Sequence, residues 1–430
     1  MHATGTFSRR DLLKLTAAGF LGGAAAPWFN TLALRAAEGP TPARSKSCIL
    51  LWMAGGPSQL ETFDMKPDSP NAGEFKPIQT NVTGIQICEL MPRLAKMTDK
   101  LAILRGMSTG EADHARGSYL MQSGYRSIAG ISHPHIGSIA AAELSQADFE
   151  LPSFFWMGTP SAAGVGFLGS KHAPFRIGNV QDEPARNIEC VVPPRGFAEF
   201  DRSMGVLEQL EQRFSDQYHG SKVLADHWAT YEQAARMMRS KKLGALDLRK
   251  EPALMRERYG DTQFGKSCLL ARRLVEAGVP FVGINLGDFD THSDNWKRLR
   301  PLLPLVDQCM STLLEDLDVR GLLSSTLVVW MGEFGRDPRI NGKGSNAGRE
   351  HYARAWSTVL AGAGIKTGQI IGKTSPGGEE VEEGKVSTID FMATLCKILG
   401  IDYSKRNTTP DGRPIRIVDT GAHPVADLFA

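Results

Sequence analysis

Short apolar runs recur along the chain at the length of a buried strand, and stretches with helical spacing of apolar residues lie between them. The strand-like runs cover residues 48–53, 101–104, 280–286, 326–331 and 357–361, and the helical patterns cover 137–145, 264–277, 296–317 and 389–399. Strands that are apolar without alternation are typical of a parallel sheet covered on both faces. The order of the elements therefore predicts an α/β fold with a mostly parallel central sheet between two helical layers.

Two segments depart from this alternation. Residues 197–262 are charged and amphipathic, and we expect them to form a helical insertion on the main domain. Residues 365–386 are rich in glycine and charge, which favours a surface loop or hairpin. No repeat divides the chain, so we expect a single domain over residues 39–430.

The N-terminus has the pattern of an export signal. Arg9 and Arg10 precede a mildly hydrophobic, Ala- and Gly-rich stretch over 15–26. Paired arginines before such a stretch indicate recognition by the twin-arginine export machinery. We therefore expect residues 1–38 to be a signal peptide, although no clear cleavage motif fixes its end. The stretch is too short and too weakly apolar to favour a spanning helix. The sequence thus predicts a periplasmic or secreted protein with no stable membrane insertion of the mature form.

Charge and cysteine content narrow the class of protein. The 430 residues include 49 Lys and Arg against 47 Asp and Glu. This balance excludes a basic nucleic-acid-binding domain as the default interpretation. The six cysteines lie far apart and none forms a C-x-x-C pair. Cys48, Cys268 and Cys396 lie in apolar segments, so we expect them to be buried thiols.

Carboxylates and imidazoles follow several of the predicted strands. Asp64 follows the first strand, His114 the second, Asp290 and His292 the third, and Glu333 and Arg336 the fourth, with Glu350 and His351 shortly after. Ligands of open parallel sheets bind beyond the carboxyl ends of the strands. We therefore expect these loops to meet at one edge of the sheet.

Such a group of side chains suits a divalent metal ion. Carboxylate oxygens with imidazole nitrogens fit Zn²⁺, Mn²⁺ or Fe, whereas oxygen ligands alone fit Ca²⁺ or Mg²⁺. We predict the metal ligands to be Asp64, Asp290, His292, Glu333 and His351. His114 and Arg336 are the predicted catalytic residues, since the guanidinium fork of Arg336 matches an oxyanion.

Structural roles remain open for the individual motifs. Asp290 and His292 alone also fit a simple turn, and Glu333 with Arg336 also fits an ion pair. His133 and His135 precede a helix and are expected to pack or cap. A nucleophile elbow of the form G-x-S-x-G and a phosphate-binding Walker loop are both absent from the sequence.

At these residues the chain resembles a known family. The carriers are the run from Gly55 to Asp64, Asp113-His114, Ser123-Gly124, His133-Pro134, Leu151-Pro152, Phe167 to Gly169, Asp290 to His292, Glu333 to Arg336, Asn341, Glu350-His351 and Gly412 to Pro414. Over residues 45–430 it looks like the secreted proteins grouped as domain of unknown function 1501, within the alkaline phosphatase and sulfatase superfamily.

The resemblance implies an alkaline-phosphatase-like three-layer sandwich that binds a phosphate or sulfate ester through one or two metal ions. By order along the chain, Asp64 resembles the first metal ligand of the superfamily, and Asp290 and His292 resemble a later pair. Glu333 then resembles the next acidic ligand and His351 the last histidine.

The chain also departs from the superfamily pattern. No cysteine starts the Cys-x-Pro-x-Arg motif of formylglycine sulfatases, and Glu333-Phe334 stands where an Asp-His pair is usual. His114 stays open as a nucleophile or a metal ligand, and Thr109 and Ser118 are the other candidates for the nucleophile.

Two functions are consistent with these observations. The first is an exported metal-dependent hydrolase of a phosphate, sulfate or related ester, on a small molecule or a glycan. The alternative is a catalytically degenerate binding or assembly protein on the same fold, since a fold alone does not define a function.

Overall fold

The computed structural model describes residues 45–183, 193, 195–217 and 222–429, and all of these belong to one compact unit. The predicted signal peptide lies outside the described residues. At the centre is an eight-stranded sheet in the order β12-β4-β11-β8-β1-β7-β5-β6. Its strands are β1 (Ser47–Met53), β4 (Leu101–Met107), β5 (Phe154–Met157), β6 (Phe175–Ile177), β7 (Phe281–Leu286), β8 (Thr326–Met331), β11 (Trp356–Gly362) and β12 (Gln369–Ile371).

The sheet is parallel except for β11. This strand runs antiparallel between β4 and β8, whereas β1 pairs in parallel with both β7 and β8. Consequently the residues that precede β11 lie at the same sheet edge as the residues that follow β1, β4, β7 and β8.

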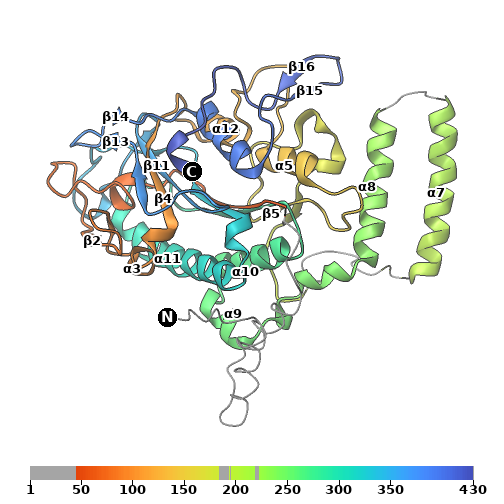
Figure 1. Cartoon of the computed structure of the whole chain (residues 1–430), viewed down its shortest axis with the longest axis horizontal. Coiled ribbons are helices and arrows are strands. Elements are labelled where there is room, and N and C mark those ends of the chain that lie inside the picture. Colours follow the sequence, from red (N-terminus) through yellow and green to blue (C-terminus); the bar gives the residue numbers. More distant parts are fainter. Residues whose placement is uncertain (1–44, 184–192, 194, 218–221, 430) are drawn as a thin grey trace, which may run out of the picture. The chain divides into compact units, whose positions relative to one another are not determined.

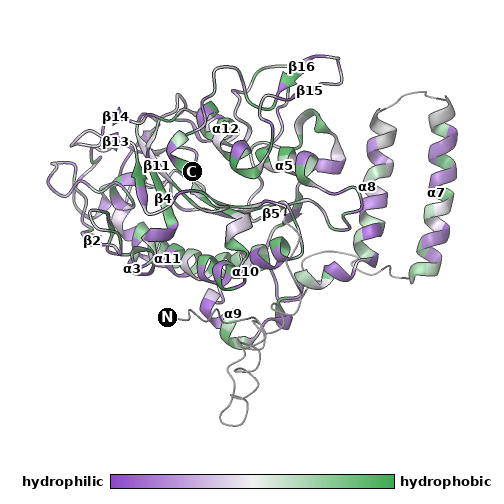
Figure 2. Ribbon diagram, in the orientation of Figure 1, coloured by the Kyte–Doolittle hydropathy of each residue, from purple (hydrophilic) through white to green (hydrophobic). Residues whose placement is uncertain are grey.

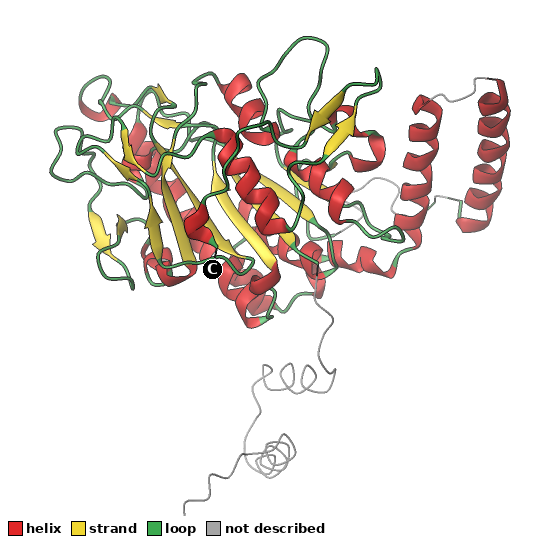
Figure 3. Ribbon diagram, turned by 45° about the horizontal axis from the view of Figure 1, so that its top comes forward, coloured by secondary structure: helices red, strands yellow, loops and turns green. Residues whose placement is uncertain are grey.

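Helices cover both faces of the sheet, as Figures 1 and 3 show. On one face lie α3 (Pro92–Ala95), α9 (Ala253–Tyr259), α10 (Gln263–Glu276) and α11 (Asn295–Val319), and on the other lie α4 (His114–Ser123), α5 (Ile136–Leu144) and α12 (Thr388–Leu399). Alternate side chains of β1 pack into the hydrophobic cores on opposite faces of the sheet. Ile49 and Leu51 pack on the side of α10 and α11, whereas Leu50 and Trp52 pack on the side of α5 and α12. Figure 2 shows the apolar residues concentrated in these strands and on the inner faces of the helices. The predicted α/β three-layer sandwich is therefore confirmed.

Local signals place the helices where periodicity predicted them. In α12, Ser387 and Asp390 form a reciprocal capping box and Gly400 ends the helix in the left-handed region. At α5, the imidazole of His135 accepts a hydrogen bond from the N–H of Gly137, so His135 caps that helix as expected. Sequence periodicity missed β5, β6 and β12, because three or four residues give too little pattern to separate a strand from a loop.

The insertion contains α7 (Phe197–Gln217) and α8 (Lys222–Arg239), followed by 3₁₀ turns over Lys241–Leu246 and Leu248–Lys250 and by α9. Within 365–386, β13 (Lys373–Thr374) and β14 (Val381–Glu383) form an antiparallel hairpin. The smaller two-stranded ladders are β2 (Pro77–Gln79) with β3 (Gln86–Cys88), β9 (Gly335–Arg336) with β10 (His351–Tyr352), and β15 (Arg406–Thr408) with β16 (Pro414–Arg416).

Five of the six cysteines fall in the described residues, and all five are free and buried. Burial raises the pKa of the Cys396 thiol to about 12, which keeps it protonated and unreactive. No helix in the described part of the chain is long and apolar enough to cross a bilayer.

Candidate metal centre

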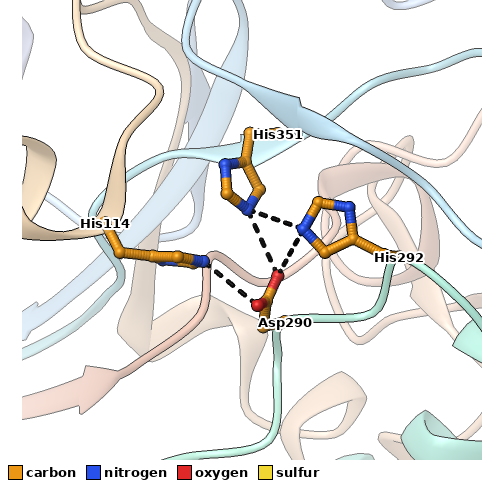
Figure 4. A group of neighbouring side chains, drawn as sticks. All are labelled: His114, Asp290, His292 and His351. Atoms are coloured by element: carbon orange, nitrogen blue, oxygen red, sulfur yellow. Dashed lines mark hydrogen bonds and ion pairs between the residues drawn. The ribbon is translucent and has the colours of Figure 1, made fainter.

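Four side chains converge at the predicted sheet edge. His114, Asp290, His292 and His351 each offer a ligand atom, and these atoms lie within 4.8 Å of one another (Figure 4). The residues come from three separate regions of the chain, and each region reaches the edge on a different element.

The loop after β4 delivers His114. Asp113 caps α4 by accepting a hydrogen bond from the N–H of Arg116, which makes His114 the first residue of the helix. One turn later in α4, a Cβ added to Gly117 would lie only 3.2 Å from the ring of Phe334. The small residue therefore lets α4 approach the segment that carries Glu333.

The loop after β7 delivers Asp290 and His292. It is fixed by residues 347–349, since Arg349 N donates to the carbonyl of Thr291 and Asn295 N donates to the carbonyl of Ala347. The contact is so close that a Cβ on Gly348 would lie 2.0 Å from the carbonyl oxygen of His292.

The short β9–β10 ladder delivers His351. In this ladder His351 lies opposite Arg336. Because β11 is antiparallel, the chain passes through His351 just before it enters the sheet, and so reaches the edge that the parallel strands reach at their ends.

Each imidazole is held from behind by a hydrogen-bond acceptor. Nδ1 of His114 lies 2.6 Å from Oε1 of Glu333, Nδ1 of His292 lies 2.6 Å from Oε2 of Glu350, and Nδ1 of His351 lies 2.7 Å from the carbonyl oxygen of Ala112. Acceptors at all three positions assign the proton to Nδ1 in each neutral ring. The three Nε2 lone pairs then point into the group.

The inward atoms are spaced as ligands of one ion. Nε2 of His292 lies 2.9 Å from Nε2 of His351, and Oδ1 of Asp290 lies 3.0 Å and 3.2 Å from these two atoms. Oδ2 of Asp290 lies 3.2 Å from Nε2 of His114. Two lone pairs facing each other at 2.9 Å repel, and a cation between them removes that repulsion. Imidazoles supported through Nδ1 by carboxylate or carbonyl groups are the usual ligands of zinc and similar metals.

The charge of Asp290 is stabilised on its protein side. Partial burial raises its pKa, but the hydrogen bond and positive charge of Arg336 outweigh burial and hold the pKa well below its usual range. The hydrogen bond to Glu333 raises the pKa of His114. The four side chains remain 21–43% exposed, so the group is open to solvent on one side.

Arg336 does not face this opening. Its guanidinium is fully buried, donates to the carbonyls of Gly55, Gly56 and Arg349, and lies 2.6 Å from Asp290. This corrects the expectation that Arg336 acts on a substrate anion, because its donors are used by the protein.

Asp64 and Glu333 also lie outside the group of four, which corrects their prediction as direct ligands. The carboxylate of Asp64 is buried and contacts Lys66 at 3.0 Å, Arg105 at 3.4 Å and the hydroxyl of Thr374. Oε1 of Glu333 is used by His114 and by the N–H of Gly55. Through Oε1, Glu333 therefore orients His114, while its Oε2 is buried without a hydrogen-bond partner among the described residues.

The run from Gly55 to Asp64 acts as a scaffold. Gly55 has a φ of +110°, and an added Cβ would lie 2.3 Å from the backbone nitrogen of Asp290. Gln59 exchanges two hydrogen bonds with the backbone of Arg336, and Glu61 forms a fully buried ion pair with Arg349 at 2.8 Å. The family resemblance identified this run and predicted Asp64 as a metal ligand, but it did not predict that the run supports the loops that carry the ligands.

Phe334 forms a wall of the site. Its ring is buried and lies 5.1 Å from that of His114 and 4.7 Å from that of His351. No second group of three or more metal-ligating side chains occurs in the residues that the structure describes.

The fold and these four side chains define an α/β protein with a group of three imidazoles and one carboxylate suited to a divalent ion. The chain belongs to the family of proteins of unknown function DUF1501, which it matches over residues 45–429.

Solved structures show weaker similarity. A sulfatase from Pseudoalteromonas sp. is 14% identical with a TM-score of 0.39, covering 88% of this chain and 72% of that one. A protein in the alkaline phosphatase superfamily from Vibrio parahaemolyticus is 10% identical with a TM-score of 0.37, covering 84% and 68%. No curated protein matches the sequence significantly. TM-scores below 0.5 assign no chemistry, so the chemistry has to come from the side chains of the site.

Proposed function

We propose that the protein is a metal-dependent hydrolase of a sulfate, phosphate or related ester, working with one divalent ion held by His114, Asp290, His292 and His351. The observation that carries the proposal is the convergence of three Nε2 atoms and one carboxylate, with every Nδ1 held by an acceptor. Three nitrogens and one oxygen favour Zn²⁺ or Mn²⁺ over Ca²⁺ or Mg²⁺, which take oxygen ligands.

Such an ion, when bound, polarises an ester oxygen and lowers the pKa of a water molecule. The chain's own residues fix the geometry around it. Glu333 and Glu350 hold His114 and His292 in the ligand tautomer, and Arg336 keeps Asp290 ionised. Hydrolysis consumes one water, breaks the S–O or P–O bond and releases the alcohol with inorganic sulfate or phosphate.

Metal analysis and turnover test the proposal together. The purified full chain should contain near-stoichiometric metal and hydrolyse p-nitrophenyl sulfate, p-nitrophenyl phosphate or the corresponding phosphodiester when Zn²⁺ or Mn²⁺ is supplied. His292→Ala should lose both metal and turnover. His423→Ala is the matched control, because His423 is exposed and outside the group.

The results discriminate between the two candidate functions. Metal without turnover on any of these esters would favour the non-catalytic binding protein. The buried position of Arg336 supports that alternative, since this guanidinium cannot reach a substrate anion at the metal group. A protein that binds no metal would contradict the proposed hydrolase.

We also propose export through the twin-arginine machinery to the periplasm or the medium, on the evidence of Arg9 and Arg10 before the apolar stretch. Replacing both residues by lysine should leave the precursor in the cytoplasm, as measured by fractionation and immunoblot. Unchanged export of this double variant would refute the proposal.

A further inference from the structure

A cleft of about 780 Å³ lies between α4, residues 124–133, the amino end of α12 and β16. Leu120 and Gly124 contribute from α4 and its C-cap, Thr388 and Ile389 from α12, and Ile415 from β16. We name it the α4–α12 cleft. Its volume falls in the range of sites for organic ligands and far exceeds the space that a sulfate or phosphate group needs.

The α4–α12 cleft begins beside the metal group. Thr109 lines it, and the N–H of Thr109 donates to the carbonyl of Ala353 at 2.7 Å. Ala353 is two residues from His351, so their Cα atoms are at most about 7.6 Å apart. From Thr109 the backbone runs on through Ala112, whose carbonyl holds His351, to His114. An ester bound at the metal group can therefore extend its alcohol part into the cleft.

The inner wall of the cleft offers flat apolar surface. The ring of Tyr125 stacks on that of His133 with centroids 4.2 Å apart, and Ile389 and Ile415 add aliphatic surface.

The rim is positively charged. Lys385 and Arg126 are exposed at the opening, and Asp419 is the one acidic residue among the described residues that line it. Within the same part of the chain Lys385 has no ion pair, and the contact of Arg126 with Glu111 is 3.6 Å long. These cations are available to an anionic ligand.

We propose that the α4–α12 cleft binds an anionic saccharide, the sugar part of a sulfated or phosphorylated glycan ester. The C–H faces of a sugar ring match the aromatic and aliphatic wall, and a second anionic substituent matches Lys385 and Arg126. This assignment rests on the proposed ester hydrolase, whose substrate class it names.

Calorimetric titration of the full chain tests whether the cleft binds an anionic saccharide. Three probes are used: a monosulfated galactose disaccharide, its unsulfated counterpart and inorganic sulfate. The sulfated disaccharide should bind wild type more tightly than the unsulfated one, and inorganic sulfate should not replace it. Lys385→Glu should weaken the sulfated disaccharide about fivefold or more, since it removes one attraction and adds one repulsion. Lys96→Glu, an exposed lysine on a segment that packs on the opposite face of the sheet, is the matched control and should bind as wild type does.

The same titration with His292→Ala separates this proposal from the proposed function. Disaccharide binding that persists in a variant without metal or turnover supports the cleft independently of the hydrolase. Failure of both disaccharides to bind wild type would overturn the saccharide assignment even if p-nitrophenyl esters are hydrolysed. An equal loss of affinity for the sulfated disaccharide in Lys96→Glu and Lys385→Glu would also overturn the saccharide assignment, because the effect would then come from the net charge of the protein.

Discussion

At the scale of single residues, the metal site depends on side chains that support the ligands without being ligands themselves. Glu350 holds His292 through Nδ1 and is in turn held by the side-chain amide of Asn341. The carboxylate thus fixes both the tautomer and the orientation of the ring. Partners of this kind commonly contribute a factor of about 10 to 100 to metal affinity.

Glu350→Ala should therefore lower Zn²⁺ affinity about 10- to 100-fold while leaving the fold intact. Competition with a chromogenic chelator measures the affinity, and circular dichroism checks the fold. Glu208→Gln, an exposed residue of α7, is the control and should change nothing. Equal affinity of Glu350→Ala and wild type would show that the ring of His292 needs no support.

His135 has a purely structural role with a pH signature. It is fully buried, and burial lowers its pKa to about 3. The unfolded chain, with a histidine pKa near 6.5, then binds a proton that the folded chain excludes. The stability of the fold is unaffected above the unfolded pKa and falls as the pH drops from about 6.5 towards about 3, by at most about 1.4 kcal/mol per pH unit.

His135→Asn should remove this pH dependence and keep the helix cap, since asparagine is a good capping residue. Urea unfolding near pH 7 and again near pH 5 measures the difference. The variant should lose less stability than wild type over this interval. A parallel loss in both proteins would assign the acid sensitivity to other groups.

At the scale of elements, close backbone contacts bring the ligand loops together. The 347–349 segment crosses the Asp290–His292 loop at Gly348 with no room for a side chain. Gly287, in the same loop region, has open space around its missing Cβ and no positive φ. The two glycines form a matched pair.

Gly348→Ala should displace His292 and weaken metal binding by about tenfold or more, because the clash is with backbone that cannot rotate away. Gly287→Ala should leave metal binding close to that of wild type. Metal affinity and the melting temperature, measured on both variants, distinguish loss of the site from general unfolding. Normal metal binding by Gly348→Ala would contradict the proposed arrangement of the loops.

The elements that sequence predicted well are the long apolar ones. β1, β7, β8 and β11 were expected to within one residue at each end, because short runs rich in apolar residues are typical of strands covered on both faces. The direction of β11 was not predictable, since antiparallel pairing depends on contacts between distant strands. That direction is what brings His351 to the site.

The candidate metal ligands were likewise predicted from the sequence only in part. Asp290 and His292 follow a central strand, which predicted that they would reach the site, whereas His351 was expected there only because it comes soon after the fourth predicted strand. Asp64 and Glu333 follow the strands in the same way, yet their carboxylates are used by Arg105 and His114. Sequence position predicts which edge a side chain reaches, whereas the direction in which it points depends on packing that the pattern does not contain.

At the scale of the whole molecule, metal binding and folding should be coupled, because the four ligands come from three regions that are far apart in the unfolded chain. Zn²⁺ at about 100 times its dissociation constant should raise the free energy of unfolding by about 2.7 kcal/mol. Differential scanning calorimetry with and without Zn²⁺ measures the shift, and His292→Ala should lose it. Equal stabilisation of His292→Ala would place the ion elsewhere.

The place of β11 also determines when the centre can assemble during synthesis. This strand lies between β4 and β8, although it is made after both of them. A nascent chain that ends before β11 has a sheet with a gap in its middle and lacks the strand that fixes His351. The ribosome must therefore deliver the chain through β11 before an ion can meet the full set of ligands.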